Sequence, residues 1–346
     1  MLISNFFRNV MRFKKQHTRS FMTFHNINHF GWLKCDCPNV PVVIQCIDAF
    51  KIPNGNMAFM KFIESETQTI IDDDEDLVNL VDADFCQDNN TLTIKEQGSI
   101  GEGISLLLEI PHNYNIDAKV ANVFVRETEG KELKLISHES CKLGKIKSDF
   151  VQVISSGEFE CKSLLGNGSL DLGRSSKLGK IQANHLDINT TGTLDISSCY
   201  CPQLKCSSTS GSINIGSLHG SSEIESLSGN VSILALDGST RVQTESADIS
   251  TTIESCKHVF LQTIQGNVSV GISDSVSAFI DASGSYIDVA QNLLTDGMKR
   301  EESTGIQYFE GKLGSSVGNT VSVKTIHGTV SFERKDWFSK FNMELD

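Results

Sequence analysis

One short phrase recurs along the middle of this chain and constrains its fold more than any other feature. The phrase reads SGSINI at residues 210–215 and SGNVSI at residues 228–233. When its glycine is taken as an anchor, successive anchors lie 19, 18, 37 and 18 residues apart, and Ala247 stands halfway through the long interval. The period is therefore 18 to 19 residues. The anchors are Gly192, Gly211, Gly229, Gly266 and Gly284, with Gly168 assigned to the same series upstream and Gly328 downstream.

Apolar residues recur at fixed distances from these anchors. They follow most anchors by two and four residues, as Ile213 and Ile215 follow Gly211, and others precede each anchor by five. Alternation of this kind is typical of short, half-buried strands. A turn of 18 residues cannot bury a core alone, whereas a stack of similar turns can. The preceding column consists of Cys206, Ile224, Val242, Leu261 and Phe279.

The repeat predicts an all-β protein, a single-chain parallel β-solenoid with about 18 residues per coil. We expect glycine at the coil corners because glycine tolerates positive φ without a steric penalty. A right-handed coil is expected, although the sequence does not fix the hand. Since the apolar columns fill such a small coil, any binding site must lie on an outer face or at an end. The stretch between Gly211 and Gly284 contains no Trp or Tyr, which disfavours an aromatic sugar-binding platform there.

Segments without the period flank the repeat. Residues 31–110 contain strand-like runs such as MAFMKFI and ISLLLEIP, and we expect them to form an N-terminal β-strand cap over the first coil. Residues 111–346 are assigned to the solenoid. After Gly284 the apolar residues are Ile287 and Val289, which are shifted by one residue relative to the other coils. The strands GIQYFEGKL and NTVSVKTI are expected to form a C-terminal hairpin. The tail KDWFSKFNMEL predicts a short capping helix.

Residues 1–30 form a basic segment with five Lys or Arg residues and no acidic residue. On a helix, most of its basic residues share one face and its apolar residues lie opposite, a pattern typical of mitochondrial transit peptides. The segment therefore predicts import into the mitochondrial matrix and a mature chain that begins near Met22. A helix on a membrane surface and an unstructured basic tail are the alternatives.

The overall charge excludes some partners. The formal net charge of −13 argues against nucleic acid, whose phosphates a binding protein must neutralise. No apolar run approaches 18 residues, so no transmembrane segment is expected. The contiguous acidic run at residues 72–76 is interpreted as a solvated loop, because a calcium loop alternates its ligands.

The chain has ten cysteines, which the mitochondrial matrix would keep reduced. Cys199, Cys201 and Cys206 are weak candidates for metal ligands. Their spacing differs from that of paired zinc knuckles, and strand residues two apart share a face, so core packing is the preferred interpretation. We therefore expect no metal and no cofactor.

Catalytic patterns are equally weak. The segment from Gly314 to Gly318 matches G-x-S-x-G, but a nucleophile elbow needs a helix after it, and a strand is expected there. His219 and His327 each precede a glycine, and we interpret both as corner residues of the repeat. No dinucleotide fingerprint, P-loop or H-E-x-x-H motif occurs. The sequence predicts no catalytic residue and no enzyme.

The order of the phrases DNNTLTI, ISLLLEIP, TSGSINI, LSGNVSI and IHGTVSF resembles the adhesin β-solenoid domain family over roughly residues 40–335. With its basic N-terminal segment, the chain is most similar to an animal protein of this type. The resemblance implies a β-solenoid that offers a binding surface, and it supplies no catalytic residues. We therefore expect a non-enzymatic scaffold that presents a polar lateral face to an unknown protein partner. The alternative is a carbohydrate-binding or carbohydrate-active solenoid, and metal binding by the cysteines is a weaker third reading.

Overall fold

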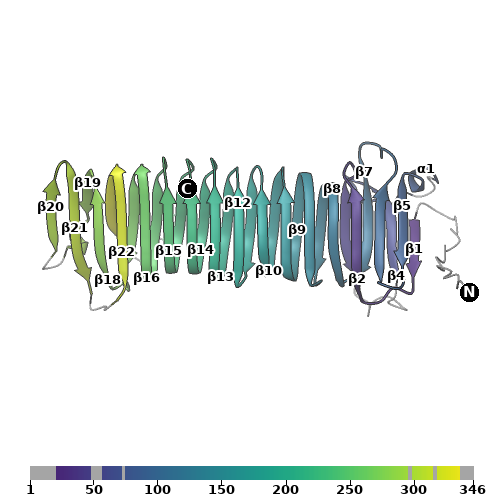
Figure 1. The fold of residues 1–346 in the computed structure, drawn as a ribbon, viewed down its shortest axis with the longest axis horizontal. Helices are drawn as coiled ribbons and strands as arrows, with labels where there is room; N and C mark the ends of the chain where they lie inside the picture. The colour runs from purple at the N-terminus through teal and green to yellow at the C-terminus, as the bar shows by residue number, and fades with distance from the viewer. Residues whose placement is uncertain (1–20, 48–56, 72–74, 295–297, 315–317, 336–346) are drawn as a thin grey trace, which may run out of the picture.

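The computed structural model describes residues 21–47, 57–71, 75–294, 298–314 and 318–335. Figure 1 shows a rod in which strands lie side by side along one long axis. The body of the rod is a parallel β-solenoid, which confirms the predicted fold class. No helix among these residues is long and apolar enough to cross a membrane. The strands of the body are β8 (Asn113–Thr128), β9 (Glu132–Ser155), β10 (Glu158–Leu172), β11 (Ser176–Gln182), β12 (His185–Thr190), β13 (Leu194–Ser208), β14 (Ile213–Ser226), β15 (Val231–Thr244), β16 (Ile249–Gln265) and β17 (Val268–Ser273).

Successive coils stack in register at the period seen in the sequence. Leu194 pairs with Ile213 of the next coil, and Ile213 pairs with Val231 of the one after. These side chains are at most 1% exposed and belong to one continuous core. Burying an aliphatic side chain of this size contributes about 1.5–3 kcal/mol to folding. Each coil is therefore stabilised by contacts with its neighbours, which a single coil cannot supply.

Buried hydroxyl groups line one corner of the solenoid. The Oγ of Ser208 donates to the carbonyl of Gly211 at 2.7 Å, and the Oγ of Ser226 donates to the carbonyl of Gly229 at 2.6 Å. The pattern S/T-x-x-G thus satisfies a backbone acceptor that would otherwise be buried without a partner. Thr190, Thr244, Thr263 and Thr325 also donate to carbonyls at this corner.

Most anchor glycines are required by close packing rather than by positive φ, which corrects the predicted reason for all but Gly266, whose φ is 159°. Gly192, Gly211 and Gly229 do not have positive φ. A Cβ atom on Gly229 would lie 2.0 Å from the carbonyl oxygen of Gly211, so a side chain at this position would require the two stacked coils to shift. Gly168 does not belong to this series: it pairs with Leu186, and Arg174 occupies the position beside Gly192.

At the N-terminal end the order of coils in space differs from their order in sequence. The strands β2 (Phe30–Cys37) and β3 (Val42–Ile47) pair in parallel with β8, and β6 (Thr91–Glu96) and β7 (Ile104–Pro111) pair in parallel with β2 and β3. The expected cap at residues 31–110 therefore includes solenoid coils, and the boundary at 110/111 is corrected. The actual cap is antiparallel: β1 (Phe21–His25) pairs with β4 (Met57–Glu64), β4 pairs with β7, and β5 (Val81–Cys86) pairs with β6. The short helix α1 spans Glu75–Val78.

The C-terminal end shows a second exchange of order. The strands β22 (Thr320–His327) and β23 (Thr329–Lys335) lie between β16 and β17 on one side and β18 (Ala278–Gly284) and β19 (Tyr286–Val289) on the other. Gly328 therefore follows Gly266 in space, and Gly284 comes last. Because Ala282 pairs with Val323 in the buried column, Phe279 lies outside it and is 44% exposed.

The hairpin expected between GIQYFEGKL and NTVSVKTI does not form. Instead β21 (Ile306–Leu313) is antiparallel to β18 and to β20 (Lys299–Ser303), and the short helix η1 spans Gln291–Leu293. The tail that predicts a capping helix lies outside the described residues. Residues 21–30, which we assigned to the basic segment, belong to the fold, since β1 is paired and Ile27 is fully buried. Residues 1–20 lie outside the described part of the chain.

Candidate functional site

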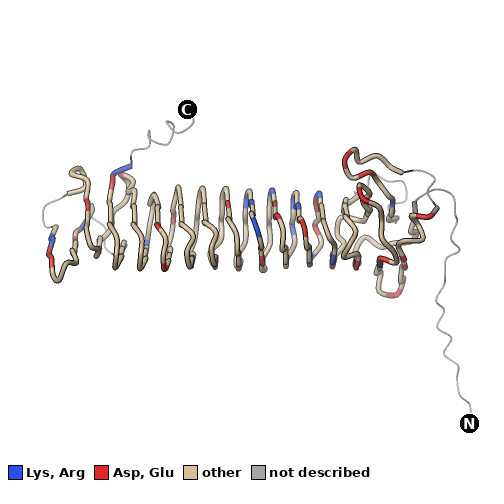
Figure 2. Tube along the Cα trace, turned by 90° about the horizontal axis from the view of Figure 1, so that it is seen from above, with Lys and Arg blue, Asp and Glu red and all other residues tan. Residues whose placement is uncertain are grey.

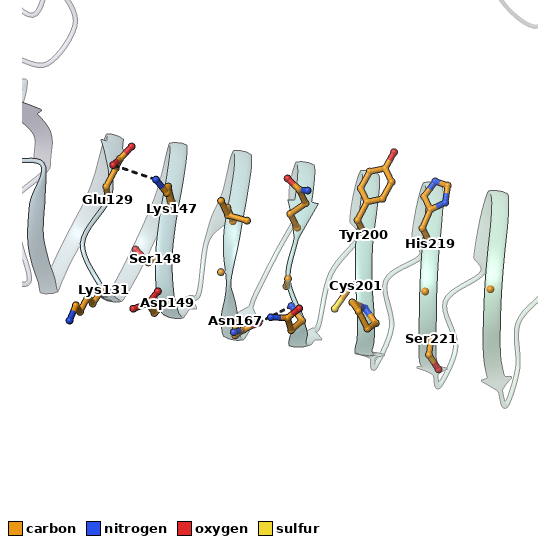
Figure 3. A pocket seen from close by; sticks show the side chains of 18 of the residues that line it. Glu129, Lys131, Lys147, Ser148, Asp149, Asn167, Tyr200, Cys201, His219 and Ser221 are labelled. Carbon is orange, nitrogen blue, oxygen red and sulfur yellow. Dashed lines mark hydrogen bonds and ion pairs between the residues drawn. The ribbon is translucent and has the colours of Figure 1, made fainter.

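A groove runs along one lateral side of the rod, parallel to its axis (Figure 3). Successive coils each contribute up to three consecutive residues to it, and we call this feature the triad groove. Its volume is about 920 Å³. With rungs about 4.8 Å apart, the eight contributing rows span seven intervals and extend over about 34 Å. The rows are Glu129–Lys131, Lys147–Asp149, Leu165–Asn167, Gln182–Asn184, Tyr200–Pro202, His219–Ser221, Gly238–Ser239 and Lys257.

The floor of the triad groove is formed by small residues, and larger polar residues rise on both sides of it. Gly220 and Gly238 have φ values of 119° and 138°, which disfavour any residue with a Cβ atom. A Cβ on Gly220 would also lie 2.2 Å from the carbonyl oxygen of Cys201. The backbone itself therefore keeps the groove open at these rows.

An aromatic pair stands at the centre of one wall. The rings of Tyr200 and His219 stack in parallel, with centroids 4.5 Å apart and planes inclined by 1°. The Nδ1 of His219 lies 3.3 Å from an Oδ of Asp237 in the next coil. On the preceding coil, the ammonium group of Lys180 lies 5.8 Å from the centroid of the Tyr200 ring. Four side chains from four successive coils thus form one continuous wall.

Neighbours on both sides of the Tyr200 ring restrict what it can bind. His219 covers one face from the following coil, and Lys180 approaches from the preceding coil. Tyr200 is nevertheless 43% exposed. A pyranose ring stacks on an open aromatic face, so this arrangement favours hydrogen bonds and edge contacts with a ligand over sugar stacking.

The N-terminal half of the triad groove carries charge. Lys147 lies 3.6 Å from Glu129, and both side chains are more than half exposed. Lys131 and Asp149 face the groove from the other wall (Figure 3). Further along this wall, the Oδ1 of Asn167 accepts hydrogen bonds from the backbone N–H groups of Asn184 and His185 at 2.8 and 3.1 Å. A ligand in this half of the groove meets charged groups and also the exposed apolar side chain of Leu165.

The cysteine candidates lie in the solenoid core. Cys199, Cys201 and Cys206 are at most 2% exposed and pair with Leu218, Gly220 and Ile224 of the next coil. Burial raises the pKa of Cys199 and of Cys206 to about 12, and it raises the pKa of Cys201 as well. Groups of three or more His, Cys, Asp or Glu residues able to hold a metal do not occur in the described part of the chain.

The two histidines interpreted as equivalent corner residues occupy different environments. His219 lies within β14 on the groove wall, whereas His327 ends β22 beside the anchor column of Gly328. The segment between Gly314 and Gly318 is followed by the strand β22, as expected, although residues 315–317 lie outside the described set.

A second 18-residue repeat, which the anchor glycines do not reveal, marks the triad groove in the sequence. A small residue stands at the centre of each triad, as in Leu165-Gly166-Asn167, Tyr200-Cys201-Pro202 and His219-Gly220-Ser221. The central residues are Gly, Ser, Ala or Cys, so a search for glycine alone misses three of the seven. Alignment of all coils at the period would have revealed a small-residue column between two polar ones.

A family model described as Toastrack DUF4097 matches residues 62–333, which is 272 of the 346 residues. The matched range includes every row of the triad groove and most of the region over which the sequence resembles an adhesin β-solenoid. No curated protein and no solved structure matches the chain.

Proposed function

Since the chain belongs to the Toastrack DUF4097 family, we propose that it is a non-enzymatic binding protein whose triad groove holds an extended segment of a protein partner. One observation carries the proposal: an open groove of about 920 Å³ runs across eight successive coils. A groove that is long, open and lined by both polar and apolar groups suits a linear chain better than a compact small molecule.

The chemistry of the groove supports binding without catalysis. A nucleophilic cysteine needs a lowered pKa, yet burial raises the pKa of Cys201 on the floor. Asp237 and His219 form a carboxylate–imidazole pair, and the groove positions no hydroxyl group within an observed hydrogen bond of that imidazole. The pair therefore fits a role in holding the wall and in donating hydrogen bonds to a ligand.

We also propose that the protein acts in the mitochondrial matrix. The support is the basic segment of residues 1–20, which carries five Lys or Arg residues and no acid. Mass spectrometry of the N terminus in fractionated cells tests this. A mature chain that begins near Met22 in mitochondria is expected, whereas an intact Met1 outside mitochondria would contradict it.

Site-specific photo-crosslinking tests the binding proposal. A photo-crosslinking residue replaces Tyr200 in the groove, and the matched control replaces Ser250, which is exposed on another face. In isolated mitochondria, position 200 is expected to yield an adduct with a defined protein that position 250 does not yield. The captured protein is then purified and titrated against the full chain. Identical adducts from both positions, or a carbohydrate adduct at position 200, would contradict the proposal.

A further inference from the structure

The charge of this protein is distributed unevenly along the rod. Residues 21–130 contain 6 Lys or Arg and 18 Asp or Glu residues, and residues 181–290 contain 3 and 11. Between them, residues 131–180 contain 9 basic and 6 acidic residues, a net charge of +3 in a chain of −13. In Figure 2 the blue Lys and Arg segments gather on these middle coils. A short basic region thus lies between two acidic ones.

Four exposed lysines in this region lie on three successive rungs. Lys145 pairs in register with Ser163, and Ser163 pairs with Lys180 of the following coil. Lys162 is adjacent to Ser163, and Lys147 is two residues from Lys145. We call Lys145, Lys147, Lys162 and Lys180 the lysine patch.

The register places an uncharged residue at the centre of the lysine patch. On the adjoining face Glu160 lies between Lys142 and Lys177, so an acid of the protein itself separates those two lysines. In the lysine patch the equivalent position is Ser163, which carries no charge. Lys145 and Lys180 are each on a rung about 4.8 Å from that of Ser163, and their flexible four-carbon stems allow both ammonium groups to reach an anion above the Ser163 hydroxyl.

The lysine patch is continuous with the triad groove. Lys147 lines the groove directly, and Lys180 lies against the ring of Tyr200. A chain that occupies the groove therefore passes the lysine patch where it crosses β9, β10 and β11. Lys147 and Lys180 therefore favour a negatively charged ligand at these rows.

We infer that the lysine patch binds a short acidic stretch of the protein segment that lies in the triad groove. This inference rests on the proposed function and adds the chemistry of the partner. The patch extends over only about 10 Å of the axis, because three rungs span two intervals. A nucleic acid along the groove, or a flat anionic membrane, would also contact the acidic regions on both sides. The acidic residues nearest to the patch, Glu127 beside Lys145 and Glu129 beside Lys147, lie within about one Debye length and would repel either of them.

Titration with an acidic peptide tests the inference. A fluorescein-labelled short polyglutamate peptide is added to the full chain, and fluorescence anisotropy is measured at low and near-physiological salt. Binding is expected at low salt and should weaken as salt rises. The double variant Lys145→Gln/Lys180→Gln should bind the peptide about fivefold more weakly, since exposed pairs contribute little each. The matched control is Lys205→Gln/Lys324→Gln, which removes the same charge from exposed sites outside the patch and should bind like the wild type.

Three results would overturn the inference. These are absence of peptide binding at low salt, an equal loss in both double variants, and tighter binding of a short single-stranded oligonucleotide than of polyglutamate. The two proposals fail separately. One outcome is that photo-crosslinking from position 200 captures a protein while the affinity for polyglutamate is the same in the wild type and in Lys145→Gln/Lys180→Gln. In that case the groove function stands and the recognition of an acidic stretch fails. If the peptide binds at the patch and no protein is captured, the affinity of the patch for acidic chains stands and the groove function fails.

Discussion

The rings of Tyr200 and His219 stack with centroids 4.5 Å apart although the two residues are 19 positions apart in the chain. The contact exists because successive coils of the solenoid stack in register, so residues one period apart lie side by side. The same relationship brings Asp237 to His219 and Lys180 to Tyr200. The residues of a lateral site in such a fold are therefore spaced one coil apart in the sequence.

A double-mutant cycle measures this stacking. Tyr200→Ala and His219→Ala are each expected to lower the free energy of unfolding by about 1 kcal/mol or less, because both side chains are partly exposed. The interaction energy between them should be about 0.5–1 kcal/mol, the usual value for an aromatic pair. Urea denaturation of the four proteins gives the result. Strict additivity would show that the rings do not stabilise each other.

The groove floor should not tolerate a side chain. Gly220→Ala is expected to lower the free energy of unfolding by about 3 kcal/mol, because it adds an unfavourable φ of 119° to a contact with the Cys201 carbonyl at 2.2 Å. Gly103→Ala is the control, since Gly103 also has positive φ, at 80°, but has nothing within 4 Å of its Cβ position. A cost of about 1–2 kcal/mol is expected there. Equal costs at both sites would contradict the close approach of stacked coils.

The apolar columns should dominate stability. Ile224 is fully buried between Cys206 and Val242, and Ile224→Ala should lower the free energy of unfolding by about 2–5 kcal/mol through lost burial and a cavity. Leu234→Ala removes a comparable side chain that is 60% exposed in the following coil. Its cost is expected to stay below about 1 kcal/mol. If the Leu234 variant is destabilised as strongly, the assignment of inward and outward positions is wrong.

Cysteine reactivity should follow burial. Cys86 is exposed and the other nine cysteines are buried, so iodoacetamide is expected to label one thiol in the folded protein and ten after unfolding.

Burial raises the pKa of Cys206 and of Cys161 to about 12, so the unfolded state loses these protons at lower pH than the folded state does. Their contribution to stability is complete below the pKa of the unfolded thiol and falls as pH rises from about 9 toward 12. Mass spectrometry and denaturation at two pH values check both statements; rapid labelling of Cys199 or Cys206 would contradict them.

Much of the fold follows from local pattern. The positions of Ile213, Val231 and Val268 after their anchors predict the strands, the register and the core, because equivalent apolar residues of successive coils pack on one another. The ends could not be predicted in this way. Periodicity shows that Val321 and Val330 fit a coil, but it does not show which two coils they lie between.

The site was harder to predict than the fold. Gly220 and Cys201 look unrelated in sequence, because what they share is small volume beside a neighbouring carbonyl. His219 looks like a corner residue until its neighbours one period away, Tyr200 and Asp237, are placed beside it. Small net effects such as the lysine patch are also concealed by the overall charge of −13, which is a sum over regions of opposite sign.

The most direct test of the account is the affinity of the protein captured from position 200 for groove variants of the full chain. Isothermal titration calorimetry compares the wild type with Tyr200→Ala and with Tyr308→Ala, both of which remove a tyrosine that is 43% exposed. If the triad groove is the binding site, Tyr200→Ala weakens binding at least tenfold, since an aromatic anchor at the centre of an interface typically contributes more than about 1.4 kcal/mol. Tyr308→Ala should bind like the wild type. Equal affinity of all three proteins would contradict the claim that the triad groove is the binding site.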